Sequence, residues 1–477
     1  MPPAVPGSPR SSPAEDGSSE QRAASRISQC YPGHAWLAAA IPLEARRFRV
    51  LDPALAHTLA DAGAELVEEG PDVEIAPLRR LRGDAPVAIV SLDAPTPDVD
   101  SRLRRAATRL AGSLRIRAEA KAAKAGIRRL RYTEVSILSW DLAQAFGVRE
   151  LPGRGAGGVA ERLPRHAAVV ARRSSGGVTA LGAAIADAAE RADGGSIHFD
   201  TPSMREAVLV AVGDSGVLRV TVGPARGQLE RQAAALEGLR VARVPELDPA
   251  CISWPIASGR SGLADWALEQ RLPGARPQPA LPARVLADCL DFLAALHSSG
   301  PRGHPDRSPV DDAELIAAVC DEERSRAVSG VAERLSGKVG YLPHGFAHGD
   351  FFRGNLLVDQ GRLAGVVDWD AAGPGRLPLL DLLHLRHMGK HLPADRDWGL
   401  TVVQHLLPWA RAGGDEVTRG FCRRLGIEPS LPLLEALVVA YWLERLAYQL
   451  STYADRTERP VWLERNVDEV LRAVATS

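Results

Sequence analysis

The sequence predicts an α/β domain followed by a larger α+β domain with a strand-rich first half and a helical second half. Between residues 30 and 194, short apolar strand-type runs alternate with helix-compatible stretches, which is typical of α/β domains. Beyond residue 195, three successive strand patterns precede a helix, and from about residue 377 the apolar residues recur at helical spacing. A chain of 477 residues is long enough for two such domains.

Composition and charge exclude several classes of protein. Hydrophobic residues make up 45% and charged residues 25% of the chain, which is typical of soluble globular proteins. A formal net charge of -1 favours no nucleic-acid partner, and the chain has no run of eighteen apolar residues that would predict a membrane span. Five scattered cysteines without a Cys-x-x-Cys pair indicate a reducing, cytoplasmic location with neither a disulfide framework nor a zinc site.

The N-terminal third divides into a tail and a domain. Residues 1–29 are rich in Pro, Ser, Gly and charge, so we expect a disordered tail, and they lack the apolar stretch of a signal peptide. Residues 30–194 resemble a degraded Rossmann-type domain, even one of methyltransferase type. The predicted strands are Arg47–Leu51, Val73–Ile75, Val87–Leu92, Arg129–Ile137 and His166–Ala171, and the predicted helices are Val99–Ala125 and Val178–Ala192.

A glycine motif inside this domain has the spacing of a dinucleotide-binding site. Gly153, Gly155 and Gly158 follow the Gly-x-Gly-x-x-Gly pattern of dinucleotide-binding domains. That fingerprint requires a strand before it and a helix after it, so that the pyrophosphate meets a helix N-terminus. Pro152 precedes the motif and Pro164 soon follows it, so we interpret it as a loop. A cofactor-binding transferase activity in this domain therefore lacks a supporting fingerprint.

The second domain is expected to begin near residue 195. Its strand-rich half should reach residue 274, and its helical half should run from 275 to 477. The predicted strands are Ser196–Ser203, Glu206–Gly213, Val217–Val222, Ile252–Ser258 and Leu263–Leu268, and the predicted helices are Gln228–Leu239, Val285–His297 and Leu433–Leu450.

The strongest chemical pattern lies in the second domain. In the segment His348-Gly349-Asp350, the aspartate is followed by Asn355 at position i+5, and Asp368 comes after a short apolar hairpin. Phosphoryl transfer to a hydroxyl needs such a set: one carboxylate orients the hydroxyl and accepts its proton, while an amide oxygen and a second carboxylate hold Mg²⁺. The spacing of Asp350 and Asn355 also matches the Asp-x-x-x-x-Asn of kinase catalytic loops.

This pattern resembles the aminoglycoside phosphotransferase and choline kinase-like superfamily of small-molecule kinases, over about residues 195–477. The resemblance implies a protein kinase-like bilobal fold, ATP and Mg²⁺ as cofactors, and a small-molecule hydroxyl as acceptor. It implies that Asp350 is the catalytic base and that Asn355 and Asp368 are the Mg²⁺ ligands. His348 and Asp381 are expected to brace the loop.

The nucleotide-binding half departs from the pattern of this superfamily. The third strand should supply a Lys to the phosphates and the following helix a Glu to hold it. Arg219 and Gln232 stand at these places, and a shift in register would make Glu230 or Glu237 the partner instead.

The segment after the last predicted strand resembles the hinge whose backbone bonds the adenine edge. Glu269 and Arg271 lie in it, so we expect both to contribute to cofactor binding.

Two functions follow from these residues. The first is an ATP-dependent phosphotransferase that moves the γ-phosphoryl group to a hydroxyl of a sugar, an aminoglycoside-like compound or another metabolite. The second is a catalytically weak or inactive nucleotide-binding module, motivated by Arg219, Gln232 and the glycine-free turn Thr201–Arg205. Acidic residues near the C-terminus are interspersed with arginines, so the sequence does not favour a cationic acceptor.

Overall fold

The structure is a computed structural model, and it describes residues 34–93, 115–116, 118–127, 130, 132–137, 149–150, 166–174, 177–192, 196–199, 207–244, 246–277, 280–298, 308–377, 379–388, 397–452 and 461–475. The predicted tail 1–29, the glycine motif 153–158 and the turn 201–205 lie outside these ranges, as does most of the helix predicted over 99–125.

The N-terminal domain is built on a mixed sheet of strand order β2-β1-β3-β4-β7-β5. β1 pairs in parallel with β2 and β3, and β3 with β4, whereas β7 is antiparallel to both β4 and β5. The α/β character is observed, but a Rossmann-type sheet, which is mostly parallel, is not confirmed. The elements are α2 (Leu37–Ala40), β1 (Arg47–Val50), α3 (Pro53–Asp61), β2 (Glu65–Leu66), β3 (Val73–Ile75), β4 (Val87–Asp93), β5 (Glu134–Ile137), β7 (His166–Arg172) and α6 (Ala180–Arg191).

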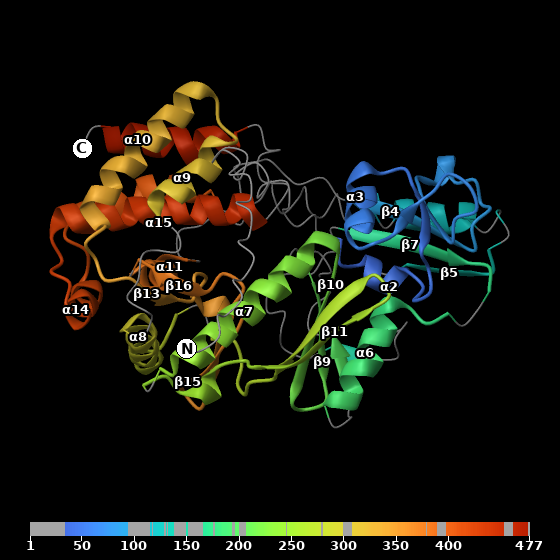
Figure 1. Cartoon of the computed structure of the whole chain (residues 1–477), viewed down its shortest axis with the longest axis horizontal. Coiled ribbons are helices and arrows are strands. Elements are labelled where there is room, and N and C mark those ends of the chain that lie inside the picture. The colour runs from blue at the N-terminus through green and yellow to red at the C-terminus, as the bar shows by residue number, and fades with distance from the viewer. Residues whose placement is uncertain are drawn as a thin grey trace, which may run out of the picture.

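A second sheet has the strand order β11-β12-β10-β9-β8-β6. Adjacent strands in it are antiparallel, except that β6 and β8 are parallel. The helix α7 follows β10, as the sequence predicted. Figure 1 shows this sheet and α7 between the N-terminal domain and the helical part of the chain. The elements are β6 (Arg149–Glu150), β8 (Ile197–Phe199), β9 (Val208–Val212), β10 (Gly216–Val222), α7 (Arg226–Ala242), β11 (Pro255–Ser261) and β12 (Ala264–Gln270).

The two sheets share one hydrophobic core. Side chains of β1, β3, α2 and α6 form a single buried cluster with those of β9, β10 and β12. The contact is close at Gly223, where a Cβ atom would lie 2.5 Å from the Thr58 carbonyl oxygen of α3. The predicted boundary near residue 195 therefore falls between elements that bury a common apolar surface.

The helical part contains two short two-stranded sheets: β14 and β15 form a hairpin, and β13 pairs with the more distant β16. Its core includes side chains of α7, so this helix joins the strand-rich and helical halves. The elements are α8 (Ala283–Ser298), α9 (Pro309–Ala317), α10 (Glu322–Val339), β13 (Gly345–Ala347), β14 (Leu356–Asp359), β15 (Arg362–Val366), β16 (Gly373–Arg376), α11 (Leu380–His387), α12 (Trp398–Thr401), α13 (Leu407–Arg411), α14 (Glu416–Arg424), α15 (Leu431–Thr452) and α16 (Glu469–Ala475).

Strand boundaries differ from the prediction at β11 and β12. β11 begins at Pro255 instead of Ile252, and β12 extends to Gln270, so Glu269 lies inside a strand. The side chain of Glu269 is therefore placed by the sheet register, with consequences for the site below. Among the described helices, none has both the length and the hydropathy that a membrane-spanning segment needs.

Candidate active site

The loop between β13 and β14 is shaped by a glycine. Gly349 has a φ of +77°, and a Cβ atom there would lie 2.2 Å from the carbonyl oxygen of Ala371. Only glycine fits this left-handed, closely packed position. The tight turn places Asp350 at the start of the loop, and the β14–β15 hairpin then returns the chain to Asp368.

Asp381, at the start of α11, fastens this turn. Its buried carboxylate accepts hydrogen bonds from the backbone N–H groups of His348 and Gly349, both at 2.8 Å. His297 Nε2 lies 3.3 Å from the same carboxylate. Burial raises the pKa of Asp381, but the His297 contact and these donors outweigh it and lower the pKa to about 2. The carboxylate thus stays ionised and holds the loop backbone.

His348 is buried within the loop. Its Nδ1 accepts a hydrogen bond from Asp350 N at 3.3 Å, and its Nε2 lies 3.2 Å from the carbonyl oxygen of Val367. Burial lowers the His348 pKa, so a neutral ring with the proton on Nε2 satisfies both contacts. The ring also packs on Trp369, with centroids 4.6 Å apart. This arrangement links the Asp350 loop to the segment that carries Asp368.

The Asp350 carboxylate is held from three directions. Arg445 Nη1 donates to Oδ1 at 3.0 Å, and Asn355 Nδ2 donates to Oδ2 at 3.0 Å. His384 Nε2 lies 3.0 Å from Oδ1. Arg445 also donates to the Gly349 carbonyl oxygen through Nη2. Burial raises the pKa of Asp350, but the His384 contact and the Arg445 charge outweigh it and hold the pKa well below its usual value.

His384 is itself oriented by a tyrosine. Its Nδ1 lies 2.8 Å from the Tyr441 hydroxyl, on α15. Burial and the nearby Arg445 charge lower the His384 pKa, so the ring is neutral near pH 7. A hydroxyl that donates to Nδ1 leaves the proton on Nε2, facing Asp350.

Asp368 has an uncommon backbone conformation. Its φ is +71°, in the left-handed region that non-glycine residues rarely adopt, and such strain clusters at functional sites. Its Oδ1 lies 3.1 Å from Nη2 of Arg219, from β10. The predicted phosphate-binding arginine and the predicted metal ligand are thus ion-paired with each other.

The second partner of Arg219 is Glu269, not Gln232. Glu269 Oε1 lies 3.5 Å from Arg219 Nε. β10 and β12 are antiparallel, and Val217 is opposite Glu269, so Arg219 and Glu269 are diagonal neighbours on one face. Gln232 contributes a hydrogen bond to Glu269, whose pKa is raised by burial despite the Arg219 charge.

The alternative partner Glu237 is placed elsewhere. Its Oε1 lies 2.8 Å from Arg240 Nη2, and both side chains are more than half exposed.

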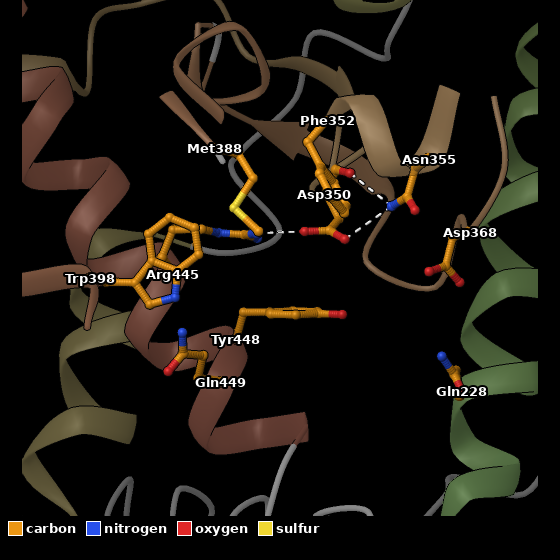
Figure 2. A pocket seen from close by; sticks show the side chains of 10 residues that line it. All are labelled: Gln228, Asp350, Phe352, Asn355, Asp368, Met388, Trp398, Arg445, Tyr448 and Gln449. Carbon is orange, nitrogen blue, oxygen red and sulfur yellow. Dashed lines mark hydrogen bonds and ion pairs between the residues drawn. The ribbon is translucent and has the colours of Figure 1, made fainter. Parts of the chain in front are cut away.

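A cavity of about 120 Å³ lies between α7 and the helical part. Figure 2 shows the Asp350 loop above it, Gln228 of α7 on one side and α15 on the other. Its lining residues are Gln228, Asp350, Phe352, Asn355, Asp368, Met388, Trp398, Arg445, Tyr448 and Gln449.

The oxygen atoms facing this cavity suit a magnesium ion. Asn355 uses its Nδ2 on Asp350, and Figure 2 shows its amide oxygen on the side facing Asp368. Asp368 Oδ1 is buried and, apart from the Arg219 ion pair, has no hydrogen-bond partner in the described part of the chain. Burial and the Asp368 charge raise the pKa of neighbouring Asp370 to about 7, so negative charge is crowded here. In the described ranges no three His, Cys, Asp or Glu residues form a metal centre, so phosphate and water oxygens would have to complete the shell around Asn355 and Asp368.

The structure brings Asp350, Asn355 and Asp368 to one cavity and places His348 and Asp381 behind them. Arg219, Gln232 and Glu269 form a cluster that contacts Asp368. Arg271 lies apart: its side chain donates to the Gly213 carbonyl oxygen at 3.4 Å and does not line the cavity. Arg271 directly follows β12, and its backbone N–H donates to the carbonyl oxygen of Ser215 in the β9–β10 turn.

His384 was not predicted from the sequence, and Arg445 and Tyr441 were not singled out. They come from α11 and α15, far along the chain from Asp350. One signal was available: Glu444 and Arg445 interrupt an apolar stretch of α15, and charged residues there are expected to be buried in pairs. Both are buried, and Glu444 is ion-paired with Arg376.

A comparison with models of protein families agrees with these motifs. Residues 205–417 match the model of the "Phosphotransferase enzyme family". No curated protein is similar to the chain in a sequence comparison.

Several solved structures are similar to part of the chain. The ADP-bound aminoglycoside phosphotransferase APH(2'')-Ib is 14% identical, with a TM-score of 0.41 over 60% of this chain and 96% of that chain. The streptomycin–ATP complex of APH(2")-IIa has 14% identity and a TM-score of 0.41 over 60% and 94% of the two chains. An apo thermostable mutant of APH(4)-Ia has 20% identity and a TM-score of 0.36 over 57% and 92%.

The family match spans the segment that carries Asp350, Asn355 and Asp368. The predicted resemblance is thus confirmed: residues 205–417 have the sequence pattern of the phosphotransferase enzyme family.

Proposed function

We propose that the protein is an ATP-dependent phosphotransferase that moves the γ-phosphoryl group to a hydroxyl of a small molecule. The observation that carries the proposal is the convergence of Asp350, Asn355 and Asp368 on one cavity, within a segment that matches a phosphotransferase family. A proton acceptor and two oxygen ligands for a metal are the groups that this reaction requires.

Asp350 would act through its Oδ2 atom. Oδ1 already contacts Arg445 Nη1 and His384 Nε2, whereas Oδ2 accepts a hydrogen bond only from Asn355 Nδ2 in the described contacts. A carboxylate oxygen accepts about two hydrogen bonds, so Oδ2 keeps one position for an acceptor hydroxyl. The lowered pKa of Asp350 makes it a weak base, so its main contribution is to orient the hydroxyl and to take the proton late.

Asn355 and Asp368 would hold Mg²⁺. When bound there, Mg²⁺ supplies positive charge that neutralises the phosphate oxygens. Arg219, held by Glu269, provides a further cation beside Asp368 and can turn its guanidinium toward phosphate.

The proposed reaction balances as a single displacement. The acceptor oxygen forms a bond to the γ-phosphorus, and the bond from that phosphorus to the β–γ bridging oxygen breaks. The hydroxyl proton passes to Asp350 Oδ2, and ADP leaves with the bridging oxygen.

One observation favours a second candidate, a nucleotide-binding module with weak or absent catalysis. Arg219 Nη2 lies 3.1 Å from Asp368 Oδ1, so the cation occupies one oxygen of the proposed metal ligand. If this ion pair persists in the nucleotide complex, Asp368 has a single oxygen left for a metal and Arg219 has fewer donors for phosphate.

Nucleotide binding and turnover, measured on the full chain, separate the two candidates. The phosphotransferase predicts that ATP raises the thermal unfolding midpoint more with Mg²⁺ than without it, and that ADP forms when hydroxyl compounds are added. A Mg²⁺-dependent thermal shift without ADP formation across a broad set of hydroxyl compounds favours the binding module. A thermal shift that does not depend on Mg²⁺ contradicts the proposed roles of Asn355 and Asp368.

A further inference from the structure

The part of the cavity that faces away from Asp368 has a distinctive lining. We call this the acceptor wall and define it by Trp398, Tyr448 and Gln449, with Met388 beside them. Figure 2 shows the Tyr448 ring extending beneath Asp350, and Trp398 and Gln449 at the far end of the same wall. A molecule that presents a hydroxyl to Asp350 would therefore rest on these side chains.

Gln449 has hydrogen-bonding capacity that the described residues leave unused. Its side chain is 3% exposed, yet its Nε2 and Oε1 atoms have no hydrogen-bond partner among the described residues. Trp398 is 4% exposed, and its indole Nε1 also lacks a partner in those ranges. Buried polar groups are normally paired, and an unpaired amide lining a cavity points to a ligand that supplies both a donor and an acceptor. Hydroxyl groups supply both.

The side chains of the acceptor wall itself carry no negative charge that would bind a cationic ligand. Arg445 is paired with Asp350, and its guanidinium carbon lies 4.8 Å from the centroid of the Tyr448 ring. One face of the Tyr448 ring is thus already occupied by a cation, and a ligand would find only the other face free. The acceptor wall has no carboxylate among its members, whereas a polyamine would need several.

An anionic ligand is disfavoured as well. The donors of Arg445 are directed to Asp350 and to the Gly349 carbonyl oxygen, and Asp350 and Asp368 would repel a negative group. Aromatic rings beside an unsatisfied donor and acceptor suit an uncharged ring compound. The C–H face of such a compound packs on an aromatic ring, and its hydroxyl groups bond the adjacent polar groups.

We propose that the acceptor is an uncharged polyhydroxylated compound of the sugar or cyclitol class, recognised by the Gln449 amide and the Trp398 indole N–H. This inference rests on the proposed function for the position of the reactive hydroxyl. It deepens that function, because it names the class of acceptor and the two residues that select it.

The test uses the full chain with Mg²⁺ and a set of pentoses, hexoses and cyclitols. Neutral members are matched with amino-substituted analogues, such as glucose with glucosamine, and kanamycin and choline serve as cationic probes. Binding is measured by calorimetry with Mg²⁺–ADP present, and turnover by ADP release with Mg²⁺–ATP. We expect at least one neutral member to bind, with kcat/KM at least about tenfold above that of its amino analogue.

Variants of the wall make the test specific. Gln449→Leu should lower kcat/KM for that neutral acceptor by roughly 10²-fold, since a site built to bond a hydroxyl loses its partner, while the Kd for Mg²⁺–ADP stays within about twofold. Trp398→Phe keeps a ring and removes the N–H, so it should reduce kcat/KM by about tenfold. If Gln449→Leu does not fold, the Trp398→Phe variant still tests whether the acceptor bonds this wall.

The outcomes are distinct. Preference for kanamycin, choline or an amino analogue overturns the proposal, as does a lack of binding by every neutral member. Unchanged acceptor binding in both variants, with their folds intact, also overturns it. If a neutral member binds and Gln449→Leu abolishes that binding, but no phosphorylated product forms, the acceptor class stands and the proposed phosphoryl transfer fails.

Discussion

Arg445 Nη1 lies 3.0 Å from Asp350 Oδ1, although 95 residues separate the two in the sequence. Its Nη2 reaches the carbonyl oxygen of Gly349, so one guanidinium holds both the carboxylate and the backbone before it. The contact ties the loop to the buried middle of α15. Asp350 is therefore positioned by a helix that lies outside the family match.

Replacement of Arg445 should disturb catalysis more than nucleotide binding. Arg445→Lys keeps the charge but loses the planar pair of donors, so we expect kcat to fall roughly 10²-fold while the Kd for Mg²⁺–ATP changes little. Steady-state kinetics and calorimetry measure the two quantities. Arg472→Lys is the matched control, because Arg472 is 64% exposed and paired only with nearby Glu469 in the described contacts. A loss of nucleotide affinity as large as the loss of kcat would argue against a role at Asp350.

Tyr441→Phe should weaken the orientation of His384. The variant removes the hydroxyl that contacts Nδ1 at 2.8 Å, and a lost hydrogen bond of about 1 kcal/mol corresponds to about a fivefold decrease in kcat. Tyr341→Phe is the control, since Tyr341 is 73% exposed. Equal kcat values for wild type and Tyr441→Phe would show that His384 does not depend on this contact.

The Arg219–Glu269 pair should matter both for stability and for nucleotide binding. Arg219→Met leaves Glu269 buried beside Asp368 without its cation, which should lower the free energy of unfolding by about 3 kcal/mol. Arg219→Met/Glu269→Leu should recover much of that stability but not the affinity for Mg²⁺–ATP. Urea unfolding and calorimetry measure the two effects.

The control for this cluster is Arg240→Met on α7. Arg240 is 68% exposed and pairs with Glu237, so its loss should leave both stability and nucleotide affinity near the wild-type values. A double variant that regained full affinity for Mg²⁺–ATP would contradict a phosphate-binding role for Arg219.

Stability in acid should depend on Asp381. Its pKa falls from an ordinary value of 3.8 to about 2 in the folded protein, so ionised Asp381 stabilises the fold above about pH 4. This contribution is lost as the pH falls through about 2. Asp381→Asn should therefore be less stable than wild type by roughly 2 kcal/mol at pH 7, and the difference should shrink between pH 4 and pH 2.

Chemical denaturation across this pH range, with exposed Asp359→Asn as control, checks the effect. A difference that stayed constant down to pH 2 would mean that packing, and not the charge of Asp381, stabilises the loop.

Local patterns explain how much of this site was predictable. Asp350, Asn355 and Asp368 follow one another within a loop and a hairpin, so their spacing, together with the family resemblance, predicted a common site. The alternation of apolar residues likewise placed the strands β9 and β10, and α7 was predicted directly after them. A sequence pattern of this kind shows which residues are close along the chain and which share one face of a helix or strand.

Contacts between distant elements were not predictable in the same way. Glu269 reaches Arg219 because of the register between β10 and β12, which depends on turn geometry and on packing of the whole sheet. His384 and Arg445 reach Asp350 because α11 and α15 pack around the loop. The shared core of the two sheets was also not predictable from the sequence. The amphipathic pattern of α6 is the same whichever sheet the helix covers.

The most direct test of the proposed mechanism is turnover by Asp350→Ala. With Mg²⁺–ATP and an acceptor that wild type phosphorylates, we expect kcat to fall by at least about 10³-fold while the Kd for Mg²⁺–ATP stays within about threefold, because Asp350 acts on the hydroxyl and not on the nucleotide. Retention of wild-type kcat by a folded Asp350→Ala protein would contradict the proposed mechanism.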